Sequence, residues 1–206
     1  MFDINKSLLP AQQETFVLLK PFFHEFYLSG GTGLSFHLQH RISFDFDLFT
    51  DHLLPRFFTR KVTQVLPIKQ MIVDTDSEVT FLDERGVKIT FLYFPYPRIG
   101  KLINIHGALV DSLDDIVANK LHVIGRRSQI RDYVDIYTLI TGTDYTIQKC
   151  IALAKQKYGN EFDPQLAIGQ LCYIDDLDFN DGAFTALGVL KEDFVSRLAQ
   201  TAREIV

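Results

Sequence analysis

Residues 26–49 read FYLSGGTGLSFHLQHRISFDFDLF. Glycine occupies three of the four positions 30–33. Because glycine adds no side-chain bulk, a turn here lets backbone N–H groups converge on an anion at the start of a helix. The sequence therefore predicts an anion-binding turn, followed by a short helix within residues 34–40.

The next segment, residues 44–49, is predicted to be a strand in which apolar and acidic side chains alternate. Successive side chains of a strand point to opposite faces, so Asp45 and Asp47 share the face that points away from the core. Two like charges at this spacing repel each other, and a bound Mg²⁺ ion, which prefers hard oxygen ligands, would remove the repulsion. Arg41 offers a structural alternative as the partner of one carboxylate.

The glycine turn followed at short distance by the Asp-x-Asp strand resembles the signature of the DNA polymerase β type nucleotidyltransferase superfamily. Together with a second block at residues 112–139, it resembles more narrowly the AbiEii/AbiGii toxin family of nucleotidyltransferase-like proteins. The resemblance implies that Asp45 and Asp47 hold Mg²⁺. It also implies that Gly30, Gly31 and Thr32 bind the phosphates of a nucleoside triphosphate.

The second block reads SLDDIVANKLHVIGRRSQIRDYVDIYTL and predicts two helices around a short break. Family members carry a similar series of a lysine, an arginine and two aspartates, which corresponds to Lys120, Arg127, Asp132 and Asp135. The resemblance implies that Lys120 acts as a point charge on a nucleotide phosphate, that Arg127 grips phosphate oxygens, and that Asp132 belongs to the catalytic set. The alternative is that these charges pair with one another and hold the helices together, which we expect for Asp135.

Superfamily members place a third carboxylate on a neighbouring strand, and this sequence departs from that pattern. Residues 71–93 predict strands around a turn at residues 83–86. The strand face where the carboxylate is expected carries Lys88, Thr90 and Leu92. The acidic residues nearby are Glu78, Asp83 and Glu84. The departure supports an alternative function, a catalytically degenerate nucleotide- or partner-binding protein that retains the fold.

Composition limits the function classes. A chain of 206 residues suits one domain, or a compact core with a helical extension. Hydrophobic residues make up 47% and charged residues 23%, which excludes wholesale disorder. Acidic residues outnumber basic ones, 26 to 21, so we do not expect the chain to bind nucleic acid non-specifically over its whole surface. Any RNA contact must come from a local basic surface.

The cysteines, the first residues and the lengths of the apolar runs together predict a cytoplasmic protein. The two cysteines, Cys150 and Cys172, form no paired motif and are expected to be reduced thiols. The first residues lack a basic segment followed by an apolar run, so we expect no secretion signal. No apolar run approaches the roughly 18 residues that a membrane span requires, so we expect no membrane contact.

The remaining patterns complete the predicted architecture. We expect helices at residues 7–23 and 51–68, a strand at residues 24–29, and a strand or loop at residues 99–110. The resulting fold class is α/β (α+β): a nucleotidyltransferase-like mixed sheet core flanked by helices, with a helical C-terminal part. We place the core at residues 1–110 and a helical region, packed on the core, at residues 111–206.

The resemblance implies a function as well. It predicts a Mg²⁺-dependent nucleotidyltransferase of the AbiEii toxin type, active in abortive infection. Such an enzyme transfers a nucleotidyl group from an NTP to RNA, for example a tRNA 3′ end, or to a protein hydroxyl. A cognate antitoxin is the expected partner.

Overall fold

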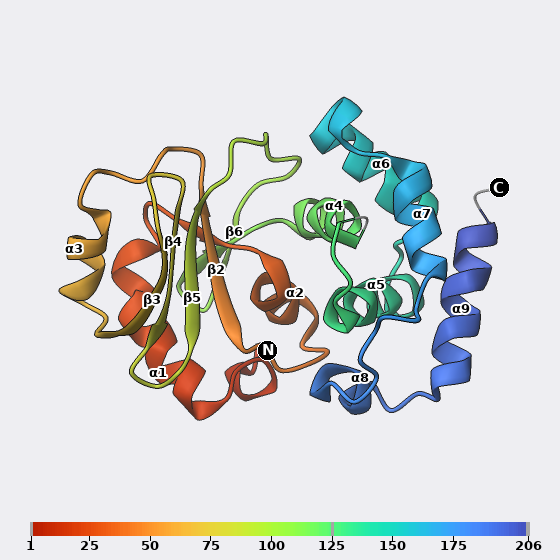
Figure 1. The fold of residues 1–206 in the computed structure, drawn as a ribbon, viewed down its shortest axis with the longest axis horizontal. Helices are drawn as coiled ribbons and strands as arrows, with labels where there is room; N and C mark the ends of the chain where they lie inside the picture. Colours follow the sequence, from red (N-terminus) through yellow and green to blue (C-terminus); the bar gives the residue numbers. More distant parts are fainter. Residues whose placement is uncertain (1, 125, 205–206) are drawn as a thin grey trace. The chain divides into compact units, whose positions relative to one another are not determined.

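The computed structural model describes residues 2–124 and 126–204. Gly125, within the second block, lies outside the described residues. The chain forms two compact units (Figure 1). Unit 1 consists of Met1–Pro97 and Lys101–Ser112, and unit 2 consists of Arg98–Gly100 and Leu113–Val206.

In the described part of the chain, unit 1 is built on a seven-stranded mixed sheet with the strand order β3-β4-β5-β2-β1-β7-β6. The strands are β1 (Tyr27–Leu28), β2 (Asp45–Thr50), β3 (Ile68–Asp74), β4 (Glu78–Asp83), β5 (Lys88–Tyr93), β6 (Ile103–Ile105) and β7 (Ala108–Val110). β2 runs parallel to β5 and antiparallel to β1. The strand that carries both acidic residues is therefore central, with neighbours on each side.

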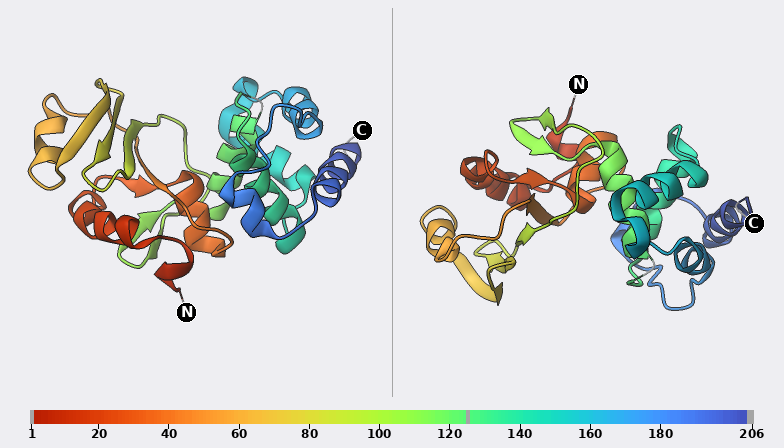
Figure 2. Two further views of the ribbon diagram at one scale, coloured as in Figure 1. Left: turned by 60° about the horizontal axis from the view of Figure 1, so that its bottom comes forward. Right: turned by 90° about the horizontal axis from the view of Figure 1, so that it is seen from above.

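Helices cover the apolar face of this sheet. They are α1 (Pro10–Leu19), the 3₁₀ turn η2 (Lys20–Phe22) and α3 (Phe58–Thr63), after a first 3₁₀ turn η1 (Ile4–Lys6). The ring centroid of Phe91 on β5 lies 5.1 Å from that of Phe22 and 5.0 Å from that of Phe58. α3 lies beside the yellow strands β3 and β4 in every view (Figures 1 and 2). Because this face holds the aromatic core, the acidic face of β2 is turned away from it.

The helices of unit 1 have other bounds than predicted, and the one expected at residues 7–23 is observed as α1 and the 3₁₀ turn η2. The helix expected at residues 34–40 begins earlier, because α2 (Gly30–Leu38) takes the glycine turn as its own first turn. The helix expected at residues 51–68 is reduced to α3, which begins only at Phe58. Pro55 interrupts the segment, and Phe57 adopts a left-handed conformation with φ 68°. The apolar spacing alone did not reveal these breaks.

The segments at the sheet edge also differ in detail from the predictions. The strand expected at residues 24–29 is limited to Tyr27 and Leu28. The segment expected as one strand or loop at residues 99–110 contains the hairpin β6–β7. His106 and Gly107, at the turn, have φ values of 53° and 89°. Positive φ at both central residues is typical of the tight turns that match the twist of a hairpin.

Unit 2 is helical in its described residues. Its helices are α4 (Leu113–Ile124), α5 (Ile130–Gly142), α6 (Ile147–Tyr158), η3 (Gly159–Glu161), α7 (Pro164–Cys172), α8 (Gly182–Leu187) and α9 (Lys191–Arg203). α4 contacts α5, α6 and α7, while α9 contacts α7 and α5. The second sequence block therefore forms two helices, as predicted, and their buried residues make the core of the unit.

Within residues 2–124 and 126–204, none of the helices combines the length and the apolar character that crossing a membrane would demand.

Candidate active site

The start of α2 lies against the acidic strand. Gly30 has a φ of 60°, and a Cβ atom placed on it would lie only 2.5 Å from Oδ2 of Asp47. The backbone N–H of Ser29, the preceding residue, donates to the Asp47 carbonyl oxygen at 3.1 Å. Glycine is therefore required at position 30 for two reasons, its left-handed backbone and the closeness of the carboxylate. The predicted pairing of the glycine turn with an acidic residue is present in the fold.

Thr32 joins the first turn of α2 to the same strand. Its hydroxyl is within hydrogen-bond reach of the Asp45 carbonyl oxygen and lies 2.8 Å from Oγ of Ser43. The Thr32 residue is buried. The contacts of this hydroxyl therefore fix the position of Asp45 relative to the helix start.

Arg41 brings a positive charge to the glycine turn. A Cβ atom on Gly31 would lie 2.7 Å from Nη2 of Arg41, and Nη1 of Arg41 donates to the Ile42 carbonyl oxygen at 3.1 Å. The arginine is buried, with 7% of its surface exposed. The tertiary structure places the guanidinium of Arg41 beside Gly31, at the predicted anion site.

The register of β2 and β5 fixes which residues share the acidic face. Asp45 lies opposite Lys88, and Asp47 lies opposite Thr90. Lys88 is exposed. Since paired residues of neighbouring strands point to the same face, a lysine and a threonine occupy the positions beside the two aspartates.

The three acidic residues near the expected third position have different surroundings. Asp83 is fully buried and accepts hydrogen bonds from the Thr15 hydroxyl and from the backbone N–H groups of Arg85 and Val87. It therefore holds the β4–β5 turn, which agrees with the predicted turn chemistry. Glu84 is exposed in that turn.

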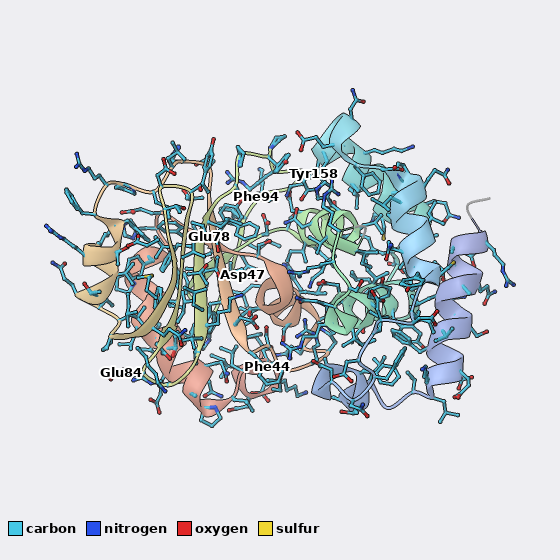
Figure 3. All side chains as sticks on the ribbon, in the orientation of Figure 1. Phe44, Asp47, Glu78, Glu84, Phe94 and Tyr158 are labelled. Carbon is cyan, nitrogen blue, oxygen red and sulfur yellow. The ribbon has the colours of Figure 1, made fainter. Side chains whose placement is uncertain are left out.

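Glu78 differs because it stands on the acidic face. β4 pairs Thr80 with Thr90, so Glu78, two residues before Thr80, shares the face of Asp47. The Thr80 hydroxyl donates to Oε1 of Glu78 at 2.6 Å. Figure 3 labels Asp47 and Glu78 on this sheet. Over the described ranges, however, no three His, Cys, Asp or Glu side chains come together closely enough to hold a metal ion.

The residues of unit 1 nevertheless suit a magnesium ion held by two protein ligands. Asp45 and Asp47 offer only carboxylate oxygens, the donor type that Mg²⁺ prefers. The missing side chain at Gly30 lets the start of α2 approach Oδ2 of Asp47 closely. Mg²⁺ is commonly bound by one or two carboxylates, with phosphate oxygens and waters completing its shell. The donor set therefore fits the metal that the sequence predicts.

Asp111 is a buried carboxylate that the sequence analysis did not single out. Its Oδ2 accepts a hydrogen bond from the Ser29 hydroxyl at 2.9 Å, and its carbonyl oxygen lies 2.8 Å from Nε2 of His37. Burial lowers the pKa of His37 below its ordinary value, although the hydrogen bond to Asp111 opposes the shift. Asp111 therefore anchors both ends of the segment from Ser29 to His37 that contains the glycine turn. Its position directly after the apolar strand β7 was the only sequence signal.

Unit 2 contains a compact charge network at the second block. The Lys120 ammonium lies 2.8 Å from Oδ1 of Asp132 and 2.6 Å from Oδ2 of Asp135. Arg127 approaches Asp132 with two nitrogens, Nε at 2.8 Å and Nη2 at 3.1 Å. The four residues matched from the family resemblance are therefore brought together in one network that links α4 to α5.

Burial differs sharply within this network. The Lys120 side chain is 6% exposed and those of Asp132 and Asp135 at most 1%, whereas the Arg127 side chain is 49% exposed. Burial by itself raises the pKa of Asp132, but the charges of Lys120 and Arg127 outweigh it and hold that pKa below its ordinary value. The carboxylate is therefore ionised, and Arg127 is the member of the network that solvent reaches most.

A second buried ion pair, between Lys157 and Asp115, holds the segment Arg98–Gly100 within unit 2. The Lys157 ammonium lies 2.8 Å from Oδ1 of Asp115, and both side chains are fully buried. Asp115 also accepts hydrogen bonds from the backbone N–H groups of Ile99 and Gly100, at 2.8 and 2.9 Å. No sequence pattern connects Asp115 with Ile99 and Gly100, which lie 16 and 15 positions before it on the other side of the hairpin.

The comparisons with known proteins agree with this fold. Residues 104–203 match the family model described as "Nucleotidyl transferase AbiEii toxin, Type IV TA system". This range contains the whole charge network of unit 2 and begins after the glycine turn and the acidic strand. An uncharacterized protein of Aquifex aeolicus (strain VF5), aq_aa25, is 28% identical over 158 residues, which cover 74% of this chain and 75% of that protein.

Two crystal structures from Helicobacter pylori have a similar fold. JHP933 aligns with a TM-score of 0.63 and 18% identity, covering 100% of this chain and 93% of that one. A candidate nucleotidyltransferase aligns with a TM-score of 0.61 and 16% identity, covering 95% of this chain and 92% of that one. The predicted fold class, a nucleotidyltransferase-like mixed sheet flanked by helices, is thereby confirmed. The predicted resemblance to the AbiEii family of nucleotidyltransferase toxins is confirmed too, by the family model over residues 104–203 and by the fold of the chain.

Proposed function

We propose that this protein transfers a nucleotidyl group from an NTP to an acceptor hydroxyl. The observation that carries the proposal is the approach of Gly30 to Asp47, in which the start of a helix and an acidic strand meet without an intervening side chain. Backbone N–H groups at a helix start attract phosphate, and carboxylates attract the metal that accompanies it. The groups that could bind the triphosphate and its metal ion therefore lie next to each other, which supports the proposal.

Asp45 and Asp47 would hold a magnesium ion. When bound, the ion supplies Lewis-acid activation of the α-phosphoryl group and neutralises charge on the leaving pyrophosphate. The first backbone N–H groups of α2 bind the phosphates, and the buried guanidinium of Arg41 adds a fixed positive charge beside Gly31. The hydrogen bond from the Thr32 hydroxyl to the Asp45 carbonyl oxygen fixes the position of Asp45 relative to the start of α2.

The reaction itself is a substitution at phosphorus. The acceptor oxygen forms a bond to the α-phosphorus, the bond from that phosphorus to the bridging oxygen of the β-phosphate breaks, and pyrophosphate leaves. The acceptor hydroxyl loses its proton to water. No oxidant or additional cofactor is required. Most of the catalytic effect would come from positioning and electrostatic stabilisation.

We further propose that Arg127 offsets phosphate charge, and that Lys120, which is buried and paired with both Asp132 and Asp135, holds together the network that positions Arg127. The ion pairs of Asp132 with each of these two cations support this division of roles. Arg127 is the better placed to reach a ligand, because half of its side chain is exposed and its planar group can bind two oxygens at once. Asp135 would complete the buried network and has a structural role.

For the acceptor we propose RNA, such as the 3′ end of a tRNA, with a protein hydroxyl as the alternative acceptor. The net charge of −5 argues against broad nucleic-acid affinity, so recognition would depend on a local surface. The family description names a type IV toxin–antitoxin system, so we propose a cognate antitoxin as partner and an action in the cytoplasm during abortive infection.

A second candidate function is a degenerate protein that binds nucleotides without reacting them. The observation in its favour is the pair of residues beside the aspartates, Lys88 and Thr90, where a third carboxylate would complete a two-metal site. Such a protein would bind an NTP with Mg²⁺ and release it unchanged.

One experiment tests the proposal. The protein is incubated with Mg²⁺, total RNA and each of the four NTPs labelled at the α-phosphate, and transfer of the label to RNA or protein is measured. We expect transfer by the wild type and loss of at least 100-fold in Asp45→Asn and Asp47→Asn, whose side chains keep their shape but lose their charge. Asp51→Asn, an exposed aspartate beyond the end of β2, is the matched control.

The outcomes separate the candidates. Transfer that persists in both asparagine variants would overturn the assignment of the site. NTP binding by the wild type without any label transfer would favour the degenerate binding protein.

A further inference from the structure

A pocket of about 540 Å³ in unit 1 is lined by residues around the start of α3 and by the turn that joins β3 to β4. Hydrogen bonds join the two segments: the Leu54 backbone N–H donates to the Asp76 carbonyl oxygen at 2.7 Å, and the Thr59 hydroxyl donates to Oδ1 of Asp74 at 2.8 Å. Both segments lie at the same end of the sheet (Figure 1). We call this cavity the end pocket, and its volume is typical of a ligand site.

The first segment brings two arginines to one aromatic ring. The guanidinium carbon of Arg56 lies 5.2 Å from the centroid of the Phe57 ring, and that of Arg60 lies 4.6 Å from it. Phe57 is 58% exposed, and both arginines are exposed as well. A guanidinium held over a ring keeps its N–H donors in its own plane, where they point outward. The end pocket therefore has two ordered cationic groups in contact with solvent.

The second segment adds carboxylates to the same pocket. Asp74 and Asp76 line it, and both residues are exposed. Three buried residues, Leu54, Phe58 and Val79, also line it. The end pocket therefore combines positive charge, apolar surface and hydrogen-bond acceptors.

These three kinds of group match the parts of one unpaired nucleotide in an RNA strand. Arginines bind phosphodiester oxygens, apolar side chains contact the faces of a base, and a carboxylate accepts hydrogen bonds from an exocyclic amino group. An acidic protein segment fits less well, because it would bring like charges to the two aspartates of the pocket. A nucleotide uses both signs of charge, since its phosphates are anionic and its base edge carries donors.

The end pocket lies beyond the strand that carries the proposed metal ligands. β2 ends at Thr50, three residues after Asp47, and Leu54 of the pocket follows four residues later. A chain of seven residues spans at most about 25 Å, so the pocket and Asp47 are no farther apart than that along this segment. A few nucleotides of single-stranded RNA cover this distance. One acceptor strand can therefore reach both places.

We propose that the end pocket binds one unpaired nucleotide of the acceptor RNA, with its flanking phosphates on Arg56 and Arg60 and its base beside Asp74 and Asp76. The inference rests on the proposed function and adds an acceptor subsite to it. Adenine, cytosine and guanine carry an amino group that donates to a carboxylate. Uracil has no amino group, and carbonyl oxygens flank its N3–H donor and repel a carboxylate. The pocket therefore selects a base with an amino group over uracil.

The test measures binding of RNA to the full chain. Fluorescently labelled decanucleotides of adenosine, cytidine or uridine are titrated by anisotropy at several salt concentrations. We expect the wild type to bind the adenosine and cytidine strands about tenfold more tightly than the uridine strand, as one well-placed base contact allows. Arg56→Gln combined with Arg60→Gln should weaken all three strands alike. It should also reduce the slope of log K against log salt by about 1.4, the value for two phosphate contacts on a single strand.

Asp76→Asn tests the base contact separately. Asparagine offers an N–H donor to the carbonyl oxygens of uracil, so the preference over the uridine strand should fall from about tenfold to about twofold or less. Asp51→Asn is the matched control, because it removes the same charge from an exposed aspartate that does not line the pocket. It should leave the preference at its wild-type value.

Phe57 is a positioning residue in this proposal, and its variants test that role. Phe57→Leu removes the ring that orders both guanidiniums, so all three strands should bind about threefold more weakly, a loss typical of exposed cation–π contacts. Phe57→Tyr keeps the ring and should restore the wild-type affinity.

A charge control and a folding control accompany these variants. Lys6→Gln combined with Lys20→Gln removes two exposed cations elsewhere in unit 1 and should leave the salt slope unchanged. Thermal unfolding of each variant shows whether the fold is intact, and the single arginine variants replace the double variant if it unfolds, with half the change in slope expected.

The outcomes distinguish this inference from the function beneath it. If the double arginine variant keeps the wild-type affinity and salt slope, the end pocket is refuted as an RNA site, while label transfer to RNA by the wild type would leave the proposed function standing. If the wild type binds no strand, or binds all three equally, the inference is refuted. Displacement of the RNA by an oligomer of glutamate as effectively as by unlabelled RNA would refute it too, because the pocket would then bind anions in general. The expected base preference without any label transfer would support the pocket and count against the proposed function.

Discussion

Gly30 and Asp47 are held so close that no side chain other than hydrogen fits between them: a Cβ atom on Gly30 would lie 2.5 Å from Oδ2 of Asp47. The contact joins the first turn of α2 to the central strand β2. It brings the helix start, with its backbone N–H groups, directly beside a carboxylate. The chemistry we propose depends on this close approach.

Gly30→Ala should therefore abolish nucleotide binding. The added methyl group must displace the Asp47 carboxylate, and alanine also resists the φ of 60° at this position. Gly86→Ala is the matched control, since Gly86 has a φ of 78° and open space around it. We expect Gly86→Ala to cost about 1 kcal/mol of stability through backbone strain alone and to bind NTPs normally. Calorimetric titration with NTP and Mg²⁺, together with urea unfolding, measures both effects; equal binding by the two variants would show that the close approach is irrelevant.

Lys88→Met should weaken NTP binding roughly fivefold, the effect of about 1 kcal/mol from one exposed charge. The ammonium stands opposite Asp45 on the acidic face, where it can offset phosphate charge in place of a second metal ion. Lys69→Met, an exposed lysine on the edge strand β3, is the control and should bind NTPs like the wild type. The affinity is measured at two salt concentrations, because screening should reduce the difference between Lys88→Met and wild type. A difference that is independent of salt would contradict the electrostatic explanation.

Lys120→Met and Arg127→Gln should separate stability from activity. Removing Lys120 leaves Asp132 and Asp135 buried without their shared cation, so we expect a loss of about 3–5 kcal/mol in the free energy of unfolding. Arg127 is half exposed, and its removal should cost about 1 kcal/mol or less. If Arg127 acts on phosphate, Arg127→Gln nevertheless loses nucleotidyl transfer by at least tenfold. Urea unfolding and the labelled-NTP assay decide the matter, and full activity of Arg127→Gln would assign the residue to structure alone.

His122→Phe should make the free energy of unfolding less dependent on pH. Burial, followed by the charge of Arg126, lowers the pKa of His122 to about 4, and the imidazole stacks on Tyr158 with ring centroids 3.8 Å apart. The unfolded chain takes up a proton near its ordinary pKa of 6.5, whereas the folded chain does so only near 4. The contribution of neutral His122 to the free energy of unfolding is therefore fully present above pH 6.5, and it declines as the pH falls from 6.5 toward 4. Phenylalanine keeps the stacking but cannot be protonated. Urea unfolding at pH 5 and pH 7 should show a smaller difference for the variant, and an unchanged difference would exclude His122 as the cause.

Much of the site could be predicted from residue types and spacing. The alternation from Phe44 to Phe49 defined a strand with both aspartates on one face, and the glycines before it defined a helix start. These are local properties, because strand periodicity and glycine conformation depend on neighbours in the chain. The helix break at Pro55 and Phe57 was also local, yet the apolar spacing obscured it.

The tertiary structure decided which charges meet. Whether Lys120 pairs with Asp132 and Asp135, whether Arg41 reaches Gly31, and whether Asp115 holds residues 99–100 all depend on segments that folding brings together. The register of β5 against β2 likewise determined that Lys88 and Thr90, rather than Glu78, stand beside the aspartates. The sequence by itself determined the acidic strand, the glycine helix start and the helical second block, because these follow from short-range geometry. The ion pairs, in contrast, follow from the packing of the whole chain, because they join segments that are far apart in the sequence.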